Sequence, residues 1–135
     1  MSHFSTMQTA FVSEDHLIAA LADVGFENVE HHEFPQNLYG WKGDRRQQTA
    51  EVIVRREFIG ATSNDIGFAR TADGTFKAII SEFDARMFDA GWLGRLSQRY
   101  AYRAARDTLA EQGFDLVEES MDEAKTIRMT VRRMA

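Results

Sequence analysis

The clearest hydrophobic pattern in the chain runs from Trp92 to Gln112. Apolar residues there recur at helical spacing, which places them along one face of an amphipathic helix. Gly113 follows at once and is a typical helix stop. The pattern therefore predicts a long helix with one covered face. Its stripe consists of Leu93, Leu96, Tyr100, Ala101, Ala104, Ala105, Thr108 and Leu109.

A shorter helix is predicted over residues 14–24. Ser13 is a good N-cap, and acidic residues in the first turn suit the helix dipole. Gly25 ends the helix. Its apolar positions are Leu17, Ile18, Leu21 and Val24.

Alternating or short apolar runs predict seven β-strands. Asp73-Gly74 is a strong hairpin turn, so the runs on either side of it are expected to pair antiparallel. The segment 34–44 holds the only proline and several turn formers, which favours a long loop or an irregular extended arm. The strands are expected at residues 4–12, 26–32, 49–57, 66–70, 76–83, 114–119 and 127–132.

One segment of the sequence has a similar counterpart further along the chain. Residues 20–30 are similar to residues 108–118, and each segment is predicted to contain the end of a helix, a glycine and the start of a strand at a Phe. The halves 1–57 and 66–135 then read as related strand-helix-strand-strand units. We therefore expect a single α+β domain over residues 1–135, in which two helices lie on one face of an antiparallel sheet of about six to seven strands.

The composition of the chain excludes some classes of function. The chain has 135 residues, no cysteine and a net charge of −5. Thiolate chemistry and cysteine-ligated metals are excluded, and the acidic balance disfavours nonspecific binding to phosphate backbones or anionic membranes. The first residues lack the features of a signal peptide, and no apolar run is long enough for a membrane helix. We expect a cytoplasmic protein.

Four arginines lie opposite the apolar stripe of the long helix. With an exposed Tyr102 they could bind an acidic protein partner, or RNA through phosphate contacts and base stacking. The alternative is a solvated face whose arginines pair with nearby acids such as Asp107 or Glu111. The first helix has no counterpart to these side chains. The candidate binding residues are Arg95, Arg99, Tyr102, Arg103 and Arg106.

A second candidate surface lies in the middle of the chain. Aromatic and basic residues gather in the segment 39–46, a composition that suits recognition by a loop on a fixed scaffold. The alternative is that the two aromatic rings only cap an open end of the core. The candidate residues are Tyr39, Trp41, Arg45 and Arg46.

Catalytic and metal signatures are missing from the sequence. His31 and His32 are adjacent, so on a strand they point to opposite faces. Asp65, Asp84 and Asp89 stand near turns, where Asp is common for backbone reasons. We expect no metal, no cofactor and no catalytic residue, and favour a protein that is not an enzyme. An enzyme or ligand carrier with a pocket between helices and sheet is the alternative.

Several short segments of the sequence together resemble a small family of hypothetical plastid and cyanobacterial reading-frame proteins with bacterial relatives, a domain of unknown function. The resemblance covers nearly the whole chain and departs from the plastid type at 34–46 and 56–64. The segments that carry the resemblance are Met1-Ser2-His3-Phe4, Asp65-Ile66-Gly67-Phe68, Gln98-Arg99-Tyr100-Ala101-Tyr102, Gln112-Gly113-Phe114 and the closing strand 127–132.

The resemblance transfers no catalytic residue. Members of that family often accompany an ATPase of the AAA class and a ferredoxin-like partner, which implies an accessory subunit. By helical phase, Tyr100 is expected to point inward and Tyr102 outward. The leading hypothesis is a non-enzymatic accessory protein that binds a protein partner, with RNA binding as the second.

Overall fold

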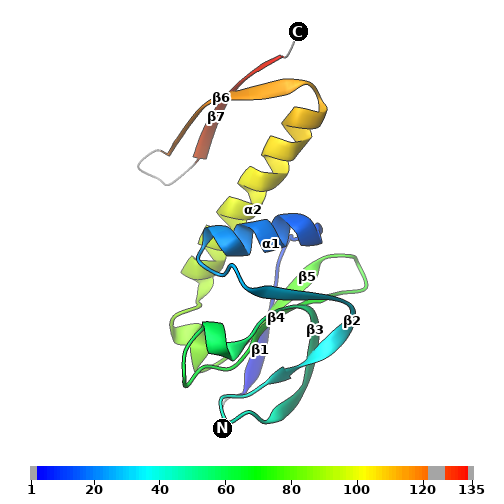
Figure 1. Cartoon of the computed structure of the whole chain (residues 1–135), viewed down its shortest axis with the longest axis vertical. Helices are drawn as coiled ribbons and strands as arrows, with labels where there is room; N and C mark the ends of the chain where they lie inside the picture. The colour runs from blue at the N-terminus through cyan, green and yellow to red at the C-terminus, as the bar shows by residue number, and fades with distance from the viewer. Residues whose placement is uncertain (1–2, 122–126, 134–135) are drawn as a thin grey trace.

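Two α-helices and seven β-strands make up the part of the chain that the computed structural model describes, residues 3–121 and 127–133 (Figure 1). The α+β class is therefore confirmed. In chain order the elements are β1 (Phe4–Gln8), α1 (Glu14–Asp23), β2 (Val29–Tyr39), β3 (Arg45–Val54), the 3-10 turn η1 (Arg56–Phe58), β4 (Ile66–Arg70), β5 (Phe76–Ser81), the 3-10 turn η2 (Asp84–Arg86), α2 (Ala90–Glu111), β6 (Phe114–Met121) and β7 (Ile127–Arg133).

Local capping explains where both helices begin and end. The Ser13 hydroxyl accepts a hydrogen bond from the His16 N–H at 3.3 Å, and the Asp89 carboxylate accepts one from the Trp92 N–H at 3.0 Å. After the helices, Gly25 and Gly113 adopt φ angles of 110° and 84°, which other residues rarely adopt. The helices predicted from the sequence are confirmed, with α2 beginning two residues earlier.

Five strands form one antiparallel sheet in the order β1-β5-β4-β3-β2. β4 and β5 are the predicted hairpin, with Phe68 opposite Ala78 and Gly74 in the turn at φ 88°. β1 pairs with β5 across a long stretch of chain, with Phe4 opposite Ser81. The sheet therefore has β1 and β2 as its two edges.

Both helices cover the same face of this sheet, which makes the body of the molecule a two-layer structure (Figure 1). Leu17 and Leu21 of α1 and Leu96 of α2 are fully buried against side chains of β3, β4 and β5. Burial of such side chains is the main favourable term in folding. The sheet residues of this core are Val52, Val54, Ile66, Phe68, Phe76, Ala78 and Ile80.

The face of the sheet opposite the helices is covered by the bent part of the edge strand β2. The register of β2 against β3 shifts between His31 and Gln36, so the strand bulges and then bends. Leu38 is thereby buried in a second cluster with Ala50, Ile53, Ala69 and Ile79. A Cβ on Gly67 would lie 2.8 Å from the Ala50 Cβ and 3.0 Å from Leu38 Cδ2, so this close approach depends on glycine.

The seven strands do not share one sheet. β6 and β7 form a separate two-stranded sheet, beside the distal part of α2 and away from the five-stranded sheet (Figure 1). The reason is helix length: α1 has 10 residues and α2 has 22. At 1.5 Å per residue the longer helix carries its hairpin roughly 18 Å further. The expectation of a single sheet of six to seven strands is corrected accordingly.

The segment 34–44 also differs from its prediction as a loop or irregular arm. Its first six residues belong to β2, and only residues 40–44 form the turn into β3. Pro35 is tolerated because β2 is an edge strand and bulges at this point. The predicted first strand, 4–12, is shorter and ends at Gln8. Within the described residues, no helix is both long enough and apolar enough to span a membrane.

Candidate functional site

Two of the four predicted arginines on α2 are engaged by α1. Asp23 accepts hydrogen bonds from Arg99 Nε at 3.1 Å and from Arg103 Nε and Nη2 at 2.9 and 2.6 Å. The Arg103 guanidinium, with Arg99 beside it, lowers the pKa of the Asp23 carboxyl. The pairing acid is the last residue of α1, whereas Asp107 contacts His16 instead. This part of the arginine face joins the two helices.

Tyr102 is buried, with 6% of its surface exposed, so the expectation of an exposed Tyr102 is wrong, although its side chain is not part of the core between the helices and the sheet. Arg99 lies over its ring at 4.4 Å, and Arg106 donates to its hydroxyl at 3.3 Å. Ile127 and Met129 of β7 line the same pocket as this tyrosine. Helical phase alone missed the burial because it takes no account of Arg99 and Arg106, whose side chains pack on the ring and the hydroxyl.

Tyr100 points inward as predicted. Its ring centroid lies 4.7 Å from that of Phe11, and its hydroxyl accepts hydrogen bonds from the N–H groups of Val12 and Ser13. Arg95 is exposed and makes no hydrogen bond or ion pair with any described residue. Of the predicted face, only Arg95 and Arg106 present guanidinium groups that no acid of the described chain holds.

The second predicted group lies at the turn between β2 and β3. Tyr39 is 39% exposed and Trp41 is 42% exposed. Lys42 lies 5.1 Å from the centre of the Trp41 ring, while Arg46 lies over Phe4 at the start of β1. Arg45 is exposed and donates to the Asn37 side chain at 2.8 Å. The structure therefore brings these residues together at one end of the five-stranded sheet.

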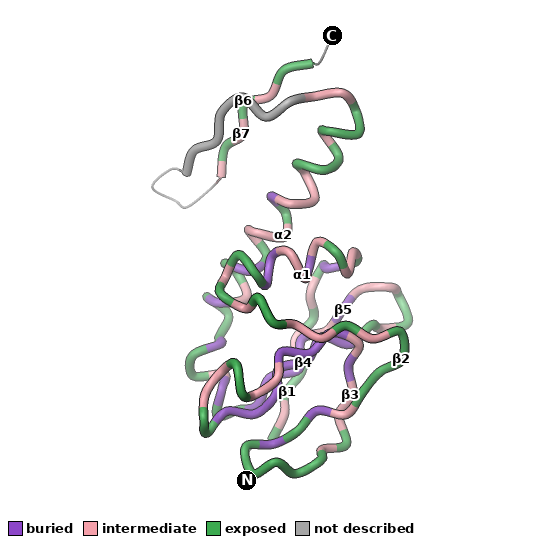
Figure 2. Tube along the Cα trace, in the orientation of Figure 1, coloured by how far each residue is buried: buried purple, intermediate pink, exposed green. Residues whose placement is uncertain are grey.

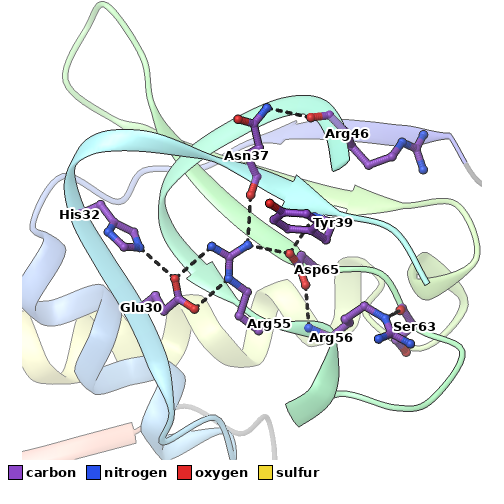
Figure 3. Close-up of polar contacts among 9 residues, drawn as sticks. All are labelled: Glu30, His32, Asn37, Tyr39, Arg46, Arg55, Arg56, Ser63 and Asp65. Atoms are coloured by element: carbon purple, nitrogen blue, oxygen red, sulfur yellow. Dashed lines mark hydrogen bonds and ion pairs between the residues drawn. The ribbon is translucent and has the colours of Figure 1, made fainter. Parts of the chain in front are cut away.

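Arg55, which the sequence reading did not single out, holds the bent part of β2 in place (Figure 3). Its guanidinium donates two hydrogen bonds to Glu30, at 2.8 and 3.0 Å, and one to Asp65 at 2.9 Å. A further bond reaches the Asn37 carbonyl oxygen at 3.0 Å. Arg55 therefore ties both ends of β2 to the residue that precedes β4.

These contacts perturb the titration of Glu30. The bidentate bond from Arg55 lowers the pKa of the Glu30 carboxyl to about 2, with a smaller effect of the same sign from His32. Asp65 is fully buried and also accepts from the N–H groups of Tyr39 and Arg56, both at 2.7 Å. All these acceptors are occupied by the chain itself, which indicates a structural role for the network.

A second buried network connects three loops at this same end. The Trp41 N–H donates to Asn64 Oδ1 at 3.0 Å, and the Asn64 N–H donates to Asp84 Oδ2 at 2.9 Å. The Ser81 hydroxyl bonds the same Asp84 oxygen at 2.8 Å. Asn64, Ser81 and Asp84 are at most 3% exposed. The turn 40–44 and the segments 56–65 and 82–89, here called the loop end, are thus fixed relative to one another.

The loop end lies at the end of the sheet far from the β6–β7 hairpin (Figure 1), and exposed stretches of the chain run through it (Figure 2). Large apolar side chains are exposed there. Seven large hydrophobic residues are exposed among those whose burial the structure describes, and five of them lie on the loop end or at its border: Tyr39, Trp41, Phe58, Phe83 and Met87. Met87 is 71% exposed. A groove of about 410 Å³ separates segment 59–63 from segment 83–88 and has Phe83 and Met87 in its lining. Such a cluster on ordered loops is typical of an interaction surface.

The carboxylates considered for catalysis have structural partners. Asp65 and Asp84 accept the hydrogen bonds just described, and Asp89 caps α2. Among the residues whose side chains the structure describes, no three His, Asp or Glu groups are placed to hold a metal ion. The space between the helices and the sheet is filled by the main core.

Comparison with known proteins assigns the chain to a family. A family model described as "Protein of unknown function (DUF1257)" matches residues 20–130. The chain belongs to this family. It is 29% identical over 135 residues to the uncharacterized protein ycf35 of Cyanophora paradoxa and 25% identical over 144 residues to that of Pyropia yezoensis. In both cases 98% of each chain is covered. No solved structure matches it. The resemblance read from the sequence is confirmed.

Proposed function

We propose that this DUF1257 protein is a non-enzymatic interaction module that binds a partner protein through the loop end. The observation that carries the proposal is the gathering of five exposed large hydrophobic side chains on loops tied together by a buried polar network. A preformed surface of this kind loses little conformational entropy on binding. Aromatic residues and Met are also enriched at protein interfaces.

The chemistry of the partner follows from the cationic side chains on the loop end and at its border. Arg86 lies over the Phe83 ring at 4.1 Å, and Lys42 lies beside Trp41, so cationic groups stand next to exposed aromatic rings. Arg45 adds a third exposed cation. A protein segment with an apolar anchor side chain flanked by carboxylates fits this arrangement. The AAA-class ATPase implied by the resemblance is one candidate for that partner.

The other two functions have less support. RNA binding relied on the arginine face of α2, but Asp23 holds Arg99 and Arg103 and Tyr102 is buried. A ligand pocket between the helices and the sheet would need space that core side chains fill. The loop end and its border carry five of the seven large hydrophobic residues that are exposed in the described part of the chain.

The test is comparative co-purification of the tagged full-length protein. A Trp41→Ala, Met87→Glu double variant removes one anchor and places a charge beside the groove. The matched control is Phe34→Ala, an aromatic residue that is 71% exposed on the β2 bulge. We expect a partner with an acidic, apolar binding segment to be retained by wild type and control, and to fall on the order of tenfold with the double variant.

Both variants change exposed side chains, so circular dichroism should show an unchanged fold. The proposal is wrong if the double variant, still folded, keeps the same partners in the same amounts. It is also wrong if wild type enriches RNA and the double variant binds it equally well.

A further inference from the structure

The two edges of the five-stranded sheet are protected very differently. β2 carries Pro35, charged side chains and the shift in register between His31 and Gln36, all of which hinder pairing with another strand. β1 has the sequence Phe-Ser-Thr-Met-Gln and pairs with β5 in an unbroken register. It contains no charged residue, no proline and no bulge. Exposed edges usually carry such protection, so its absence on β1 indicates a pairing partner.

The register shows which backbone groups of β1 face outward. The Glu82 N–H bonds the His3 carbonyl oxygen at 2.8 Å, so His3 and Glu82 form a hydrogen-bonded pair of the antiparallel ladder. Such pairs alternate along a strand. Ser5 and Met7 therefore also bond to β5, while Phe4, Thr6 and Gln8 direct their N–H and C=O groups to the open edge. Thr6 and Gln8 are exposed.

We propose that β1 pairs antiparallel with β1 of a second copy of this chain, with the two-fold axis at Thr6. In that register Thr6 faces Thr6 of the second copy, and Phe4 faces Gln8 of the second copy. Each of these pairs joins residues whose backbone groups point outward, so the two edges form about six hydrogen bonds. The two sheets become one continuous sheet across the axis.

A second copy fits this edge for a geometric reason. A two-fold axis requires a surface that complements itself. The three outward residues are spaced evenly about Thr6, so the edge has that property. The strand also brings no charge to the axis, and like charges directly opposite each other would destabilise a pair of strands. The contact rests on one short strand per copy, so we expect a weak dimer with a Kd on the order of micromolar.

The experiment is sedimentation velocity of the full-length protein over a concentration series. Wild type should dimerise as concentration rises. Thr6→Lys and Thr6→Glu should each be monomeric, because the substituted side chains meet their own charge across the axis. An equal mixture of the two variants should restore a dimer. Thr6→Val, uncharged and suited to a strand, is the matched control and should dimerise like wild type.

Thr6 is exposed, so all three variants should keep the melting temperature of a folded monomer. The rescue by mixing is specific to self-pairing centred on Thr6, because no other partner supplies the opposite charge at that position. A wild type that stays monomeric at several hundred micromolar, or a Thr6→Lys variant that dimerises as wild type does, overturns the proposal. A mixture that remains monomeric overturns it too.

Discussion

Gly67 shows how one residue permits a close contact between neighbouring strands of the sheet. Leu38 and Ala50 lie so close to its Cα that an added Cβ would have to displace Ala50 or Leu38. Gly67→Ala should therefore destabilise the protein by about 1–3 kcal/mol through overpacking. Chemical denaturation measures this.

The matched control for that substitution is Gly94→Ala. Gly94 lies inside α2, and a Cβ there would meet nothing within 4 Å. Since Ala favours the helix, this variant should be neutral or more stable by roughly 0.5–1 kcal/mol. Equal effects of the two substitutions would contradict the role given to the close contact at Gly67.

Glu30 gives the fold a defined response to acid. Its pKa falls from the ordinary value of 4.5 to about 2 because of its bonds with Arg55. Between these values the unfolded state binds more protons, so the stability from this carboxylate is present above pH 4.5 and is lost as pH falls toward 2. Glu30→Gln should be less stable than wild type near neutral pH, and the difference should shrink toward pH 2.

The measurement is urea denaturation of both proteins at a series of pH values. Glu33→Gln, an exposed position on the same strand, is the control and should track wild type throughout. A stability difference for Glu30→Gln that stays constant between pH 5 and pH 2 would mean that the Arg55 bond does not set this titration.

At the scale of elements, Asp23 and its two arginines clamp α1 to α2. The Asp23 side chain is 15% exposed, while Arg103 is 35% exposed, so solvent screens part of the attraction. Asp23→Asn should cost about 1 kcal/mol of unfolding free energy, the upper range for a partly exposed pair. A double-mutant cycle with Arg103→Gln should give a coupling energy of roughly 0.5–1 kcal/mol.

Arg95→Gln is the control for the clamp because Arg95 has no acid partner among the described residues. Its effect should stay within about 0.5 kcal/mol. If Asp23→Asn and Arg103→Gln prove additive, the clamp does not stabilise the helix pair.

The helices and the β4–β5 hairpin were predictable because their signals are local. A Ser or Asp cap, a glycine stop and an Asp-Gly turn act within a few residues. β2 was not predictable as one strand, because Pro35 and its polar neighbours are typical of a loop. Its conformation depends on Arg55, whose partners Glu30 and Asp65 come from two other segments of the chain.

At the scale of the whole molecule, the main error of the sequence-based prediction was to place β6 and β7 in the same sheet as the other strands. The two hairpins that follow the helices have similar sequences at their start, but α2 carries β6 and β7 to a different place from β2 and β3. The loop end was predicted only in its β2–β3 turn. Its other two segments come close in space through Asn64 and Asp84, and no local pattern in the sequence indicates that contact.

The pairing of β1 with β5 also has a consequence for folding. Phe4 lies opposite Ser81, so the chain between them must be closed into a loop before β1 can join the sheet. Loop closure over such a distance costs entropy before contacts compensate, and long-range strand pairing is correspondingly slow. During synthesis β1 leaves the ribosome before β5 and has no partner strand until β5 follows. The strand with the least protected edge is therefore the one that stays unpaired longest.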